Sequence, residues 1–211
     1  MIDWTMILGG CMGIAFIAAW MLVLHWWERR DERRSHSWIR TFTGKSVFPL
    51  RLRGDDLDLR DIAHSLSLQC RFNGHVGRFY SVAEHSVRVA KTLDARRYDG
   101  EAVKWGLMHD AAEAYLSDLP SPIKRTLPAY DRAEKRAQRV IAERYGLTWP
   151  IPKVVVRDDM CLCTTEARDL MGAHSLDWPS WANPLPDPIE PWRPAVAERR
   201  FLAECRRLGI K

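Results

Sequence analysis

Cysteine is scarce in this sequence, and its spacing excludes two kinds of cross-linked domain. The number of cysteines is odd, their intervals are irregular, and no Cys-x-x-Cys pair occurs. Neither a cysteine-based zinc site nor a disulfide framework is therefore indicated. We expect reduced thiols in a cytosolic domain. The cysteines are Cys11, Cys70, Cys161, Cys163 and Cys205.

Strand-like alternation of apolar and polar residues is missing, and so are internal repeats. Helical periodicity is present instead, which predicts a single all-α domain. A chain of 211 residues suffices for one core of ordinary size. Turn residues predict an extended or hairpin segment over 36–60, and six prolines predict a loop over 174–194. Helices are expected over Asp58 to Leu68, Ser81 to about Leu93, about Gly100 to Tyr115, Pro128 to about Tyr145, Pro152 to about Met171, and Pro194 to about Leu208.

Strong charge of one sign is also lacking. The net charge is only +5, and the arginines that produce it lie in short separate clusters. A mild basic excess suits an anionic small molecule, but a solvated basic surface accounts for it equally well. We therefore expect no stable nucleic-acid partner.

Charge is absent from the N-terminal stretch between Trp4 and Leu24. These 21 residues match the ~20 that cross a bilayer as a helix. Four arginines follow within residues 29–34 and no Lys or Arg precedes the stretch, so the positive-inside rule places the body in the cytoplasm. We expect an anchor over 1–34 in the inner membrane and one folded domain over 35–211. A misassigned start codon is the alternative, and the protein would then be cytoplasmic.

The strongest chemical signal is His109-Asp110, followed by Glu113 and Asp118. Neighbouring apolar residues give this stretch a packed face, and packed ionisable groups are costly unless they are satisfied. His109 and Glu113 are four apart, so they converge on one region of a helix. Imidazole together with carboxylate suits manganese, cobalt, magnesium or zinc.

Further ligands must come from other helices. His85 lies one turn into the helix that begins at Ser81, and Asp158-Asp159 lies on a later helix. Taken singly, each is more often a satisfied or exposed side chain than a ligand. Their joint order, His then His-Asp then Asp, with each on a predicted helix, indicates a metal centre.

This order resembles the signature of the HD-domain metal-dependent phosphohydrolases. Four segments extend the likeness toward the branch that contains bacterial 5′-deoxynucleotidases and phage deoxynucleoside triphosphohydrolases. They are Cys70 to His75, Phe79 to Ser86, His109 to Tyr115, and Asp118 to Lys124, and Thr165 to Met171 adds to them. The resemblance begins at about Trp38 and does not cover 1–34. It implies an HD-domain helical bundle.

The resemblance also implies roles for individual residues. His85, His109, Asp110 and Asp159 match the metal ligands, with Asp159 favoured over Asp158 because it precedes Glu166 by seven. Glu113 matches the acid that positions or deprotonates the attacking water, and Asp118 matches a residue linked to the sugar hydroxyl. Arg71 and Phe72 stand where the branch has Arg-Trp at the substrate. Lys124 is a candidate phosphate contact, and His75 is a weaker one.

The expected activity is thus metal-dependent hydrolysis of nucleotides, foremost 5′-deoxynucleotidase action on deoxynucleoside monophosphates. Triphosphohydrolase action on deoxynucleoside triphosphates is the alternative within enzymes. A membrane-tethered nucleotide-binding module without turnover is the alternative from another class, and a phosphodiesterase is a further one because fold does not fix function. A homodimer is left open because many relatives self-associate.

Overall fold

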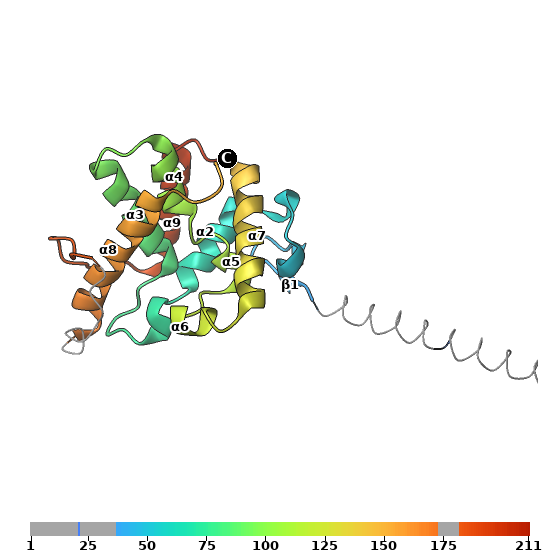
Figure 1. Ribbon diagram of the computed structural model, residues 1–211, viewed down its shortest axis with the longest axis horizontal. Helices are drawn as coiled ribbons and strands as arrows, with labels where there is room; N and C mark the ends of the chain where they lie inside the picture. Colours follow the sequence, from blue (N-terminus) through green and yellow to red (C-terminus); the bar gives the residue numbers. More distant parts are fainter. Residues whose placement is uncertain (1–20, 22–36, 173–181) are drawn as a thin grey trace, which may run out of the picture. The chain divides into compact units, whose positions relative to one another are not determined.

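The structure is a computed structural model that describes residues 21, 37–172 and 182–211. The chain divides into two compact units, Met1–Trp38 and Ile39–Lys211, and only the second is described in detail. The described part is mostly helical, which confirms the all-α prediction (Figure 1). Its longer helices are α2 (Leu59–Leu68), α3 (Val82–Ala95), α4 (Gly100–Met108), α7 (Pro128–Tyr145), α8 (Lys153–Leu170) and α9 (Pro194–Arg207).

A short hairpin opens the second unit, as predicted for residues 36–60. Strands β1 (Ile39–Arg40) and β2 (Ser46–Val47) pair antiparallel, with Ile39 opposite Val47. Asp61 on α2 accepts hydrogen bonds from the Thr43 amide and hydroxyl, at 2.6 and 2.8 Å. This buried carboxylate attaches the hairpin tip to the helical body. Two 3-10 helices follow, η1 (Pro49–Arg51) and η2 (Gly54–Asp56).

Local sequence signals account for several helix ends. Asp58, Ser81 and Asp99 each accept a backbone N–H at the start of α2, α3 and α4, which satisfies one of the unpaired donors there. Gly146 ends α7 with a positive φ of 66°, a conformation that glycine adopts without steric cost. The predicted capping box at Ser81 is half present, because the Glu84 carboxylate bonds Arg88 and the Trp192 amide instead.

The predicted helix from Gly100 to Tyr115 is wrong in its second half. Helix α4 ends at Met108, residues 109–112 form turns, and a separate short helix α5 (Glu113–Leu116) follows. The amides of Ala111 and Glu113 bond carbonyls three residues back rather than four. The regular winding therefore ends at His109, whose amide still bonds the Trp105 carbonyl, and tighter turns begin after it. Another short helix, α6 (Ser121–Lys124), was not predicted.

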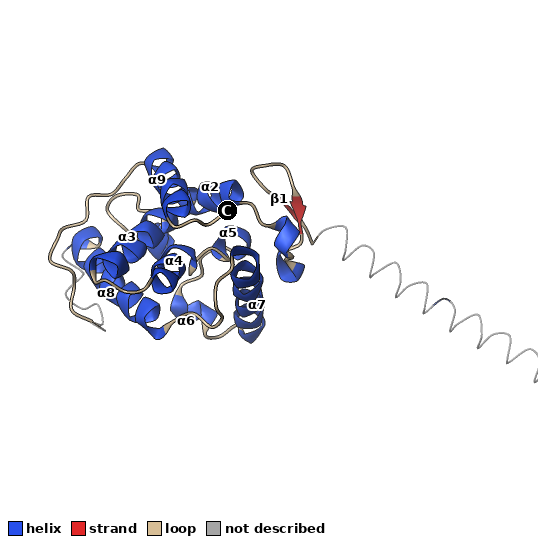
Figure 2. Ribbon diagram, turned by 90° about the horizontal axis from the view of Figure 1, so that it is seen from above, coloured by secondary structure: helices blue, strands red, loops and turns tan. Residues whose placement is uncertain are grey.

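Helix α3 lies at the centre of the unit and packs against α2, α4, α8 and α9 (Figure 2). Its approach to α4 is close at Gly106, where a Cβ would lie 2.5 Å from Leu93 Cδ1 and 3.1 Å from the Ala90 Cα. A residue other than glycine here would require the Leu93 side chain to move and the backbone at Ala90 to shift slightly. In both views α7 lies beside the hairpin, and α8 lies on the other side of the unit.

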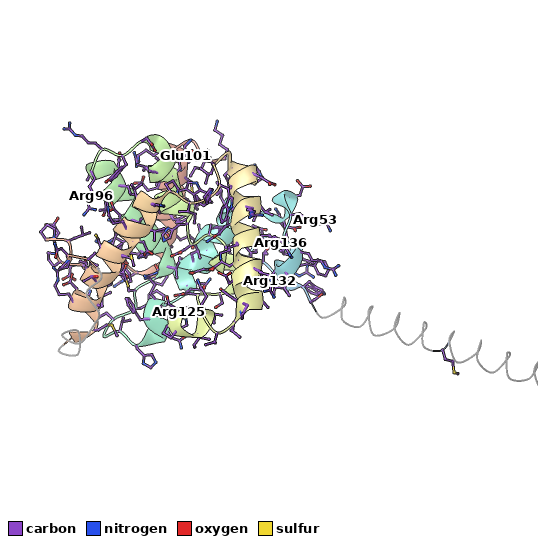
Figure 3. The ribbon with its side chains drawn as sticks, viewed as in Figure 1. Arg53, Arg96, Glu101, Arg125, Arg132 and Arg136 are labelled. Carbon is purple, nitrogen blue, oxygen red and sulfur yellow. The ribbon has the colours of Figure 1, made fainter. Side chains whose placement is uncertain are left out.

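The predicted membrane anchor lies outside the described residues, apart from Met21. Among the residues that the structure does describe, no helix is long and apolar enough to span a bilayer. Labelled arginines of the second unit lie on several sides of it: Arg53, Arg132 and Arg136 near α7, Arg96 near α3, and Arg125 near α6 (Figure 3). They belong to four different segments of the chain, because Arg132 and Arg136 both lie on α7.

Candidate metal centre

Three elements bring His85, His109 and Asp159 together. His85 lies in the first turn of α3, His109 follows α4, and Asp159 lies in the second turn of α8. One ligand atom from each residue lies within 4.8 Å of the other two. The two Nε2 atoms are 3.3 Å apart, and His85 Nε2 is 3.0 Å from Asp159 Oδ1. These three side chains could hold a metal ion. This supports a metal site here without identifying the metal.

The other nitrogen of each imidazole is already engaged. His85 Nδ1 lies 2.6 Å from Glu166 Oε1, and His109 Nδ1 lies 2.9 Å from the Gly106 carbonyl oxygen. Both partners can only accept, so each Nδ1 carries a proton. In the neutral rings the Nε2 lone pairs then point into one space, where they repel unless a cation lies between them. The tautomers therefore fit a metal ion.

Asp110 supplies a second carboxylate to the cluster. Its Oδ2 lies 3.2 Å from His109 Nε2 and 3.7 Å from His85 Nε2. The side chains of Asp110 and Asp159 are 18% and 33% exposed, whereas that of His85 is fully buried. The cluster thus opens to solvent on its carboxylate side, which is where a substrate would approach.

The charges of the cluster depend on one another. Burial and Arg71 lower the pKa of His85, but Glu166 and Asp159 outweigh them and raise it to about 9. Burial alone would raise the pKa of Asp110, yet His109, His85 and Arg71 lower it. The pKa of Asp159 is likewise lowered by His85 and His109 against the effect of burial. The carboxylates stay ionised, and a metal cation would take the place of protons on the imidazoles.

Asp158 and Asp159 point to different environments. Asp158 is fully buried, and its Oδ1 accepts from Arg96 at 2.5 Å and Arg157 at 3.0 Å. Its Oδ2 has no hydrogen-bond partner in the described part of the chain. Of the two, Asp159 belongs to the metal cluster, as the sequence spacing favoured.

This difference gives a direct prediction. Asp159→Asn should weaken binding of Mn²⁺ by more than about 10-fold, because a neutral amide replaces an anionic ligand. Asp158→Asn should leave that affinity unchanged and lower the free energy of unfolding by about 1–3 kcal/mol, because Arg96 and Arg157 lose their charged partner. Isothermal titration with Mn²⁺ and urea unfolding measure the two effects. Equal losses of affinity in both variants would contradict the assignment.

Glu113 lies one turn beyond the metal cluster, at the start of α5. It is buried, and its Oε2 has no hydrogen-bond partner among the described residues. Burial, Asp110 and Asp118 all raise its pKa. Burial and Asp110 also raise the pKa of the half-buried Asp118, although Arg71 opposes them. A buried carboxylate with an unpaired oxygen and a raised pKa is, when ionised, a stronger base than an exposed glutamate.

The residues predicted to contact the substrate differ in how far their side chains are already engaged by other residues. Arg71 forms ion pairs with two residues of the metal centre, with its Nε 3.1 Å from Glu166 and its Nη1 3.6 Å from Asp110. Phe72 follows with a positive φ of 55° and its ring 5.5 Å from the Arg71 guanidinium carbon. Lys124 Nζ bonds Glu134 at 2.6 Å, so its charge is already partnered. His75 is exposed at the end of the same turn as Phe72.

Two residues that support the site carried no predicted role. Glu166 is fully buried and joins His85 to Arg71; its spacing of seven from Asp159 signalled a shared face but not this bridge. Gln69 accepts from the Asp118 amide and donates to the Glu113 carbonyl, both at 3.1 Å. It fixes both ends of the segment that carries Glu113 and Asp118. Nothing in the sequence around Gln69 signals this contact.

Comparison with known proteins places the chain in a family. No protein-family model matches it. Over 143 residues it is 43% identical to the uncharacterized protein YfdR of Escherichia coli K12. The aligned region covers 68% of this chain and 78% of YfdR. Over 138 residues it is 33% identical to the uncharacterized protein RCAP_rcc00048 of Rhodobacter capsulatus. This aligned region covers 63% of this chain and 70% of that protein. The chain belongs to the family of YfdR.

Proposed function

We propose that this protein is a metal-dependent phosphohydrolase of the HD type that acts on nucleotides. The observation that carries the proposal is the convergence of two imidazole Nε2 atoms, 3.3 Å apart, beside the carboxylates of Asp110 and Asp159. These groups come from separate elements, and each imidazole is oriented by a second partner, as is usual for metal ligands. The order of these residues in the sequence supports the same class.

In this proposal His85, His109, Asp110 and Asp159 hold the divalent ion. A bound ion of this kind polarises a phosphoryl oxygen and lowers the pKa of a bound water. Glu113 accepts a proton from the attacking water through its unpaired Oε2. Its raised pKa makes the ionised carboxylate a stronger base. Manganese, cobalt, magnesium and zinc all suit the ligand set.

The substrate would be held by groups around this cluster. Asp118 is a candidate for the sugar hydroxyl, and Phe72 for the base or sugar face. Arg71 would meet the phosphate while it remains beside Glu166 and Asp110. Lys124 would have to share its ammonium between Glu134 and the phosphate. A deoxynucleoside monophosphate is the proposed substrate, with a deoxynucleoside triphosphate as the alternative.

Product analysis tests this function. The full-length chain, stripped of metal, is assayed with ribo- and deoxynucleoside mono- and triphosphates after addition of Mn²⁺, Co²⁺, Mg²⁺ or Zn²⁺. We expect metal-dependent release of inorganic phosphate from deoxynucleoside monophosphates. Release of inorganic triphosphate would favour the alternative substrate. Tight nucleotide binding with no turnover under any metal would contradict the enzyme proposal and favour a binding module.

The cellular setting is a separate part of the proposal. An uncharged run from Trp4 to Leu24 followed by arginines supports an inner-membrane anchor with residues 35–211 in the cytoplasm. Fractionation of cells that express the full chain tests it. Recovery of the chain in the soluble fraction would contradict the anchor and favour the misassigned start.

A further inference from the structure

Residues 185–192 lack regular secondary structure, yet side chains of two helices hold their backbone in place. Pro186, Pro188 and Pro191 offer no N–H, and each fixes its own φ. Of the backbone N–H groups that remain, three donate to side chains of α3 or α8. They belong to Leu185, Ile189 and Trp192. We call residues 185–192 the strap.

One set of contacts holds the strap to α8. The Leu185 amide donates to Thr165 Oγ1, and the Ile189 amide donates to Asp169 Oδ2, both at 2.8 Å. Arg168 donates to the Leu185 carbonyl at 2.8 Å. Ile189 is buried in the core between these bonds and the next ones. The strap is therefore held along α8 through the Leu185 and Ile189 amides and the Leu185 carbonyl.

A second set holds the strap to α3. The Trp192 amide donates to Glu84 Oε2 at 2.7 Å, and Arg88 donates to the Glu190 carbonyl at 3.0 Å. The Arg88 guanidinium also bonds Glu84, and it lies 4.8 Å from the Trp192 ring centre. Arg200 of α9 lies 4.1 Å from the same ring. Glu84 is fully buried, so this contact is shielded from solvent.

Two of the attachment points are sequence neighbours of residues of the metal centre. Thr165 precedes Glu166, and Glu84 precedes His85. Successive residues of a helix point about 100° apart, so one neighbour can face the strap while the other faces the centre. Glu166 and His85 are bonded to each other at 2.6 Å. The strap is bonded to both α3 and α8, and the bond between His85 and Glu166 joins the same two helices.

We propose that the strap is a positioning element that fixes the separation of α3 and α8, and through it the arrangement of His85, Glu166 and Asp159. The proposal rests on the metal centre put forward above, since its effect is on metal affinity. None of the hydrogen bonds described for the strap involves His85, His109, Asp110 or Asp159. The strap's contribution is to keep two ligands from different helices within reach of one ion.

Removal of one attachment point tests the strap. Asp169→Ala deletes the acceptor of the Ile189 amide, whereas Asp169→Asn keeps an oxygen there. Val47→Ala in the hairpin is the matched control, because it removes buried apolar volume far along the chain from the strap. Each variant of the full-length chain is titrated with Co²⁺ by calorimetry. The visible Co²⁺ spectrum and the Tm without metal are also recorded.

We expect Asp169→Ala to weaken Co²⁺ binding by about 3–10-fold, below the full effect of a direct partner of a ligand. The Co²⁺ spectrum should shift, and Asp169→Asn should restore affinity to within about twofold. Val47→Ala should lower Tm without either change. Unchanged affinity in Asp169→Ala, despite a lower Tm, would overturn the strap alone. A wild-type protein that binds no Co²⁺ would overturn the metal centre together with the strap's role in it.

Discussion

His109→Ala should abolish metal-dependent turnover and weaken divalent-metal binding by more than about 100-fold. The change removes one of the two Nε2 atoms that converge at 3.3 Å, and no other described nitrogen is positioned to replace it. Outer partners of metal ligands already contribute about 10–100-fold to affinity, so loss of a direct ligand should exceed that range. Asp110→Ala should act in the same direction, because its Oδ2 lies beside both imidazoles.

Thermal unfolding gives a readout that does not depend on knowing the substrate. A ligand at 100 times its Kd stabilises the folded state by about 2.7 kcal/mol, or roughly 5–10 °C in Tm for a domain of this size. Added Mn²⁺ should therefore raise the Tm of the wild-type protein and leave that of His109→Ala unchanged.

The control for this variant is another histidine paired with a carboxylate. His64 lies on α2 with Nδ1 3.2 Å from Glu198 and its ring stacked on Phe42, outside the metal cluster. His64→Ala should lower the Tm without metal, yet keep the full rise when Mn²⁺ is added. A full metal-induced rise in His109→Ala, or full activity in that variant, would contradict the ligand assignment.

The start or end of a helix was predictable from the sequence where a proline, glycine or capping residue determines it. Pro128 at the first turn of α7 and Gly146 after its last turn bound that helix, and both are visible in the sequence. Ser81 likewise locates the start of α3, and thereby His85 one turn in. Apolar periodicity supplied the rest, because each of these helices buries one face against the core.

The turn at His109 was not predictable because its residues are all compatible with a helix. Contacts distant in the sequence accompany the end of α4, since Asp110 lies 3.6 Å from Arg71 Nη1 and 3.7 Å from His85 Nε2. The left-handed backbone of Phe72 is a similar case, since an aromatic residue does not favour it and it costs roughly 1–2 kcal/mol there, whereas the following Asn73 tolerates it. The surrounding contacts impose this conformation on the turn that follows Arg71.

Glu166→Gln is expected to produce the second largest effect, although Glu166 is not itself a proposed ligand. In the native chain its carboxylate accepts from His85 at 2.6 Å and from Arg71 at 3.1 Å. Burial would raise its pKa, but Arg71 and His85 lower it, so the group is an anion that accepts at both oxygens. An amide has only one oxygen, and one of the two donors must then face an NH₂ group.

Either orientation of the amide damages the site. If the NH₂ group faces Arg71, two donors meet in a buried place and the guanidinium loses its charged partner. If it faces His85, the imidazole must accept at Nδ1 and carry its proton on Nε2, which removes that nitrogen as a metal ligand. We therefore expect Mn²⁺ affinity to fall by about 10–100-fold, as for other partners of ligating histidines.

Asp61→Asn provides the matched control for this change. Asp61 is also a buried carboxylate that accepts two hydrogen bonds, but both come from Thr43 in the hairpin. Its replacement should reduce stability and leave Mn²⁺ affinity as in the wild type. Calorimetric titration of both variants, with urea unfolding of each, separates the two effects. If Glu166→Gln bound Mn²⁺ as tightly as the wild type, Glu166 would be a structural partner of Arg71 only, and the tautomer of His85 would be fixed by other means.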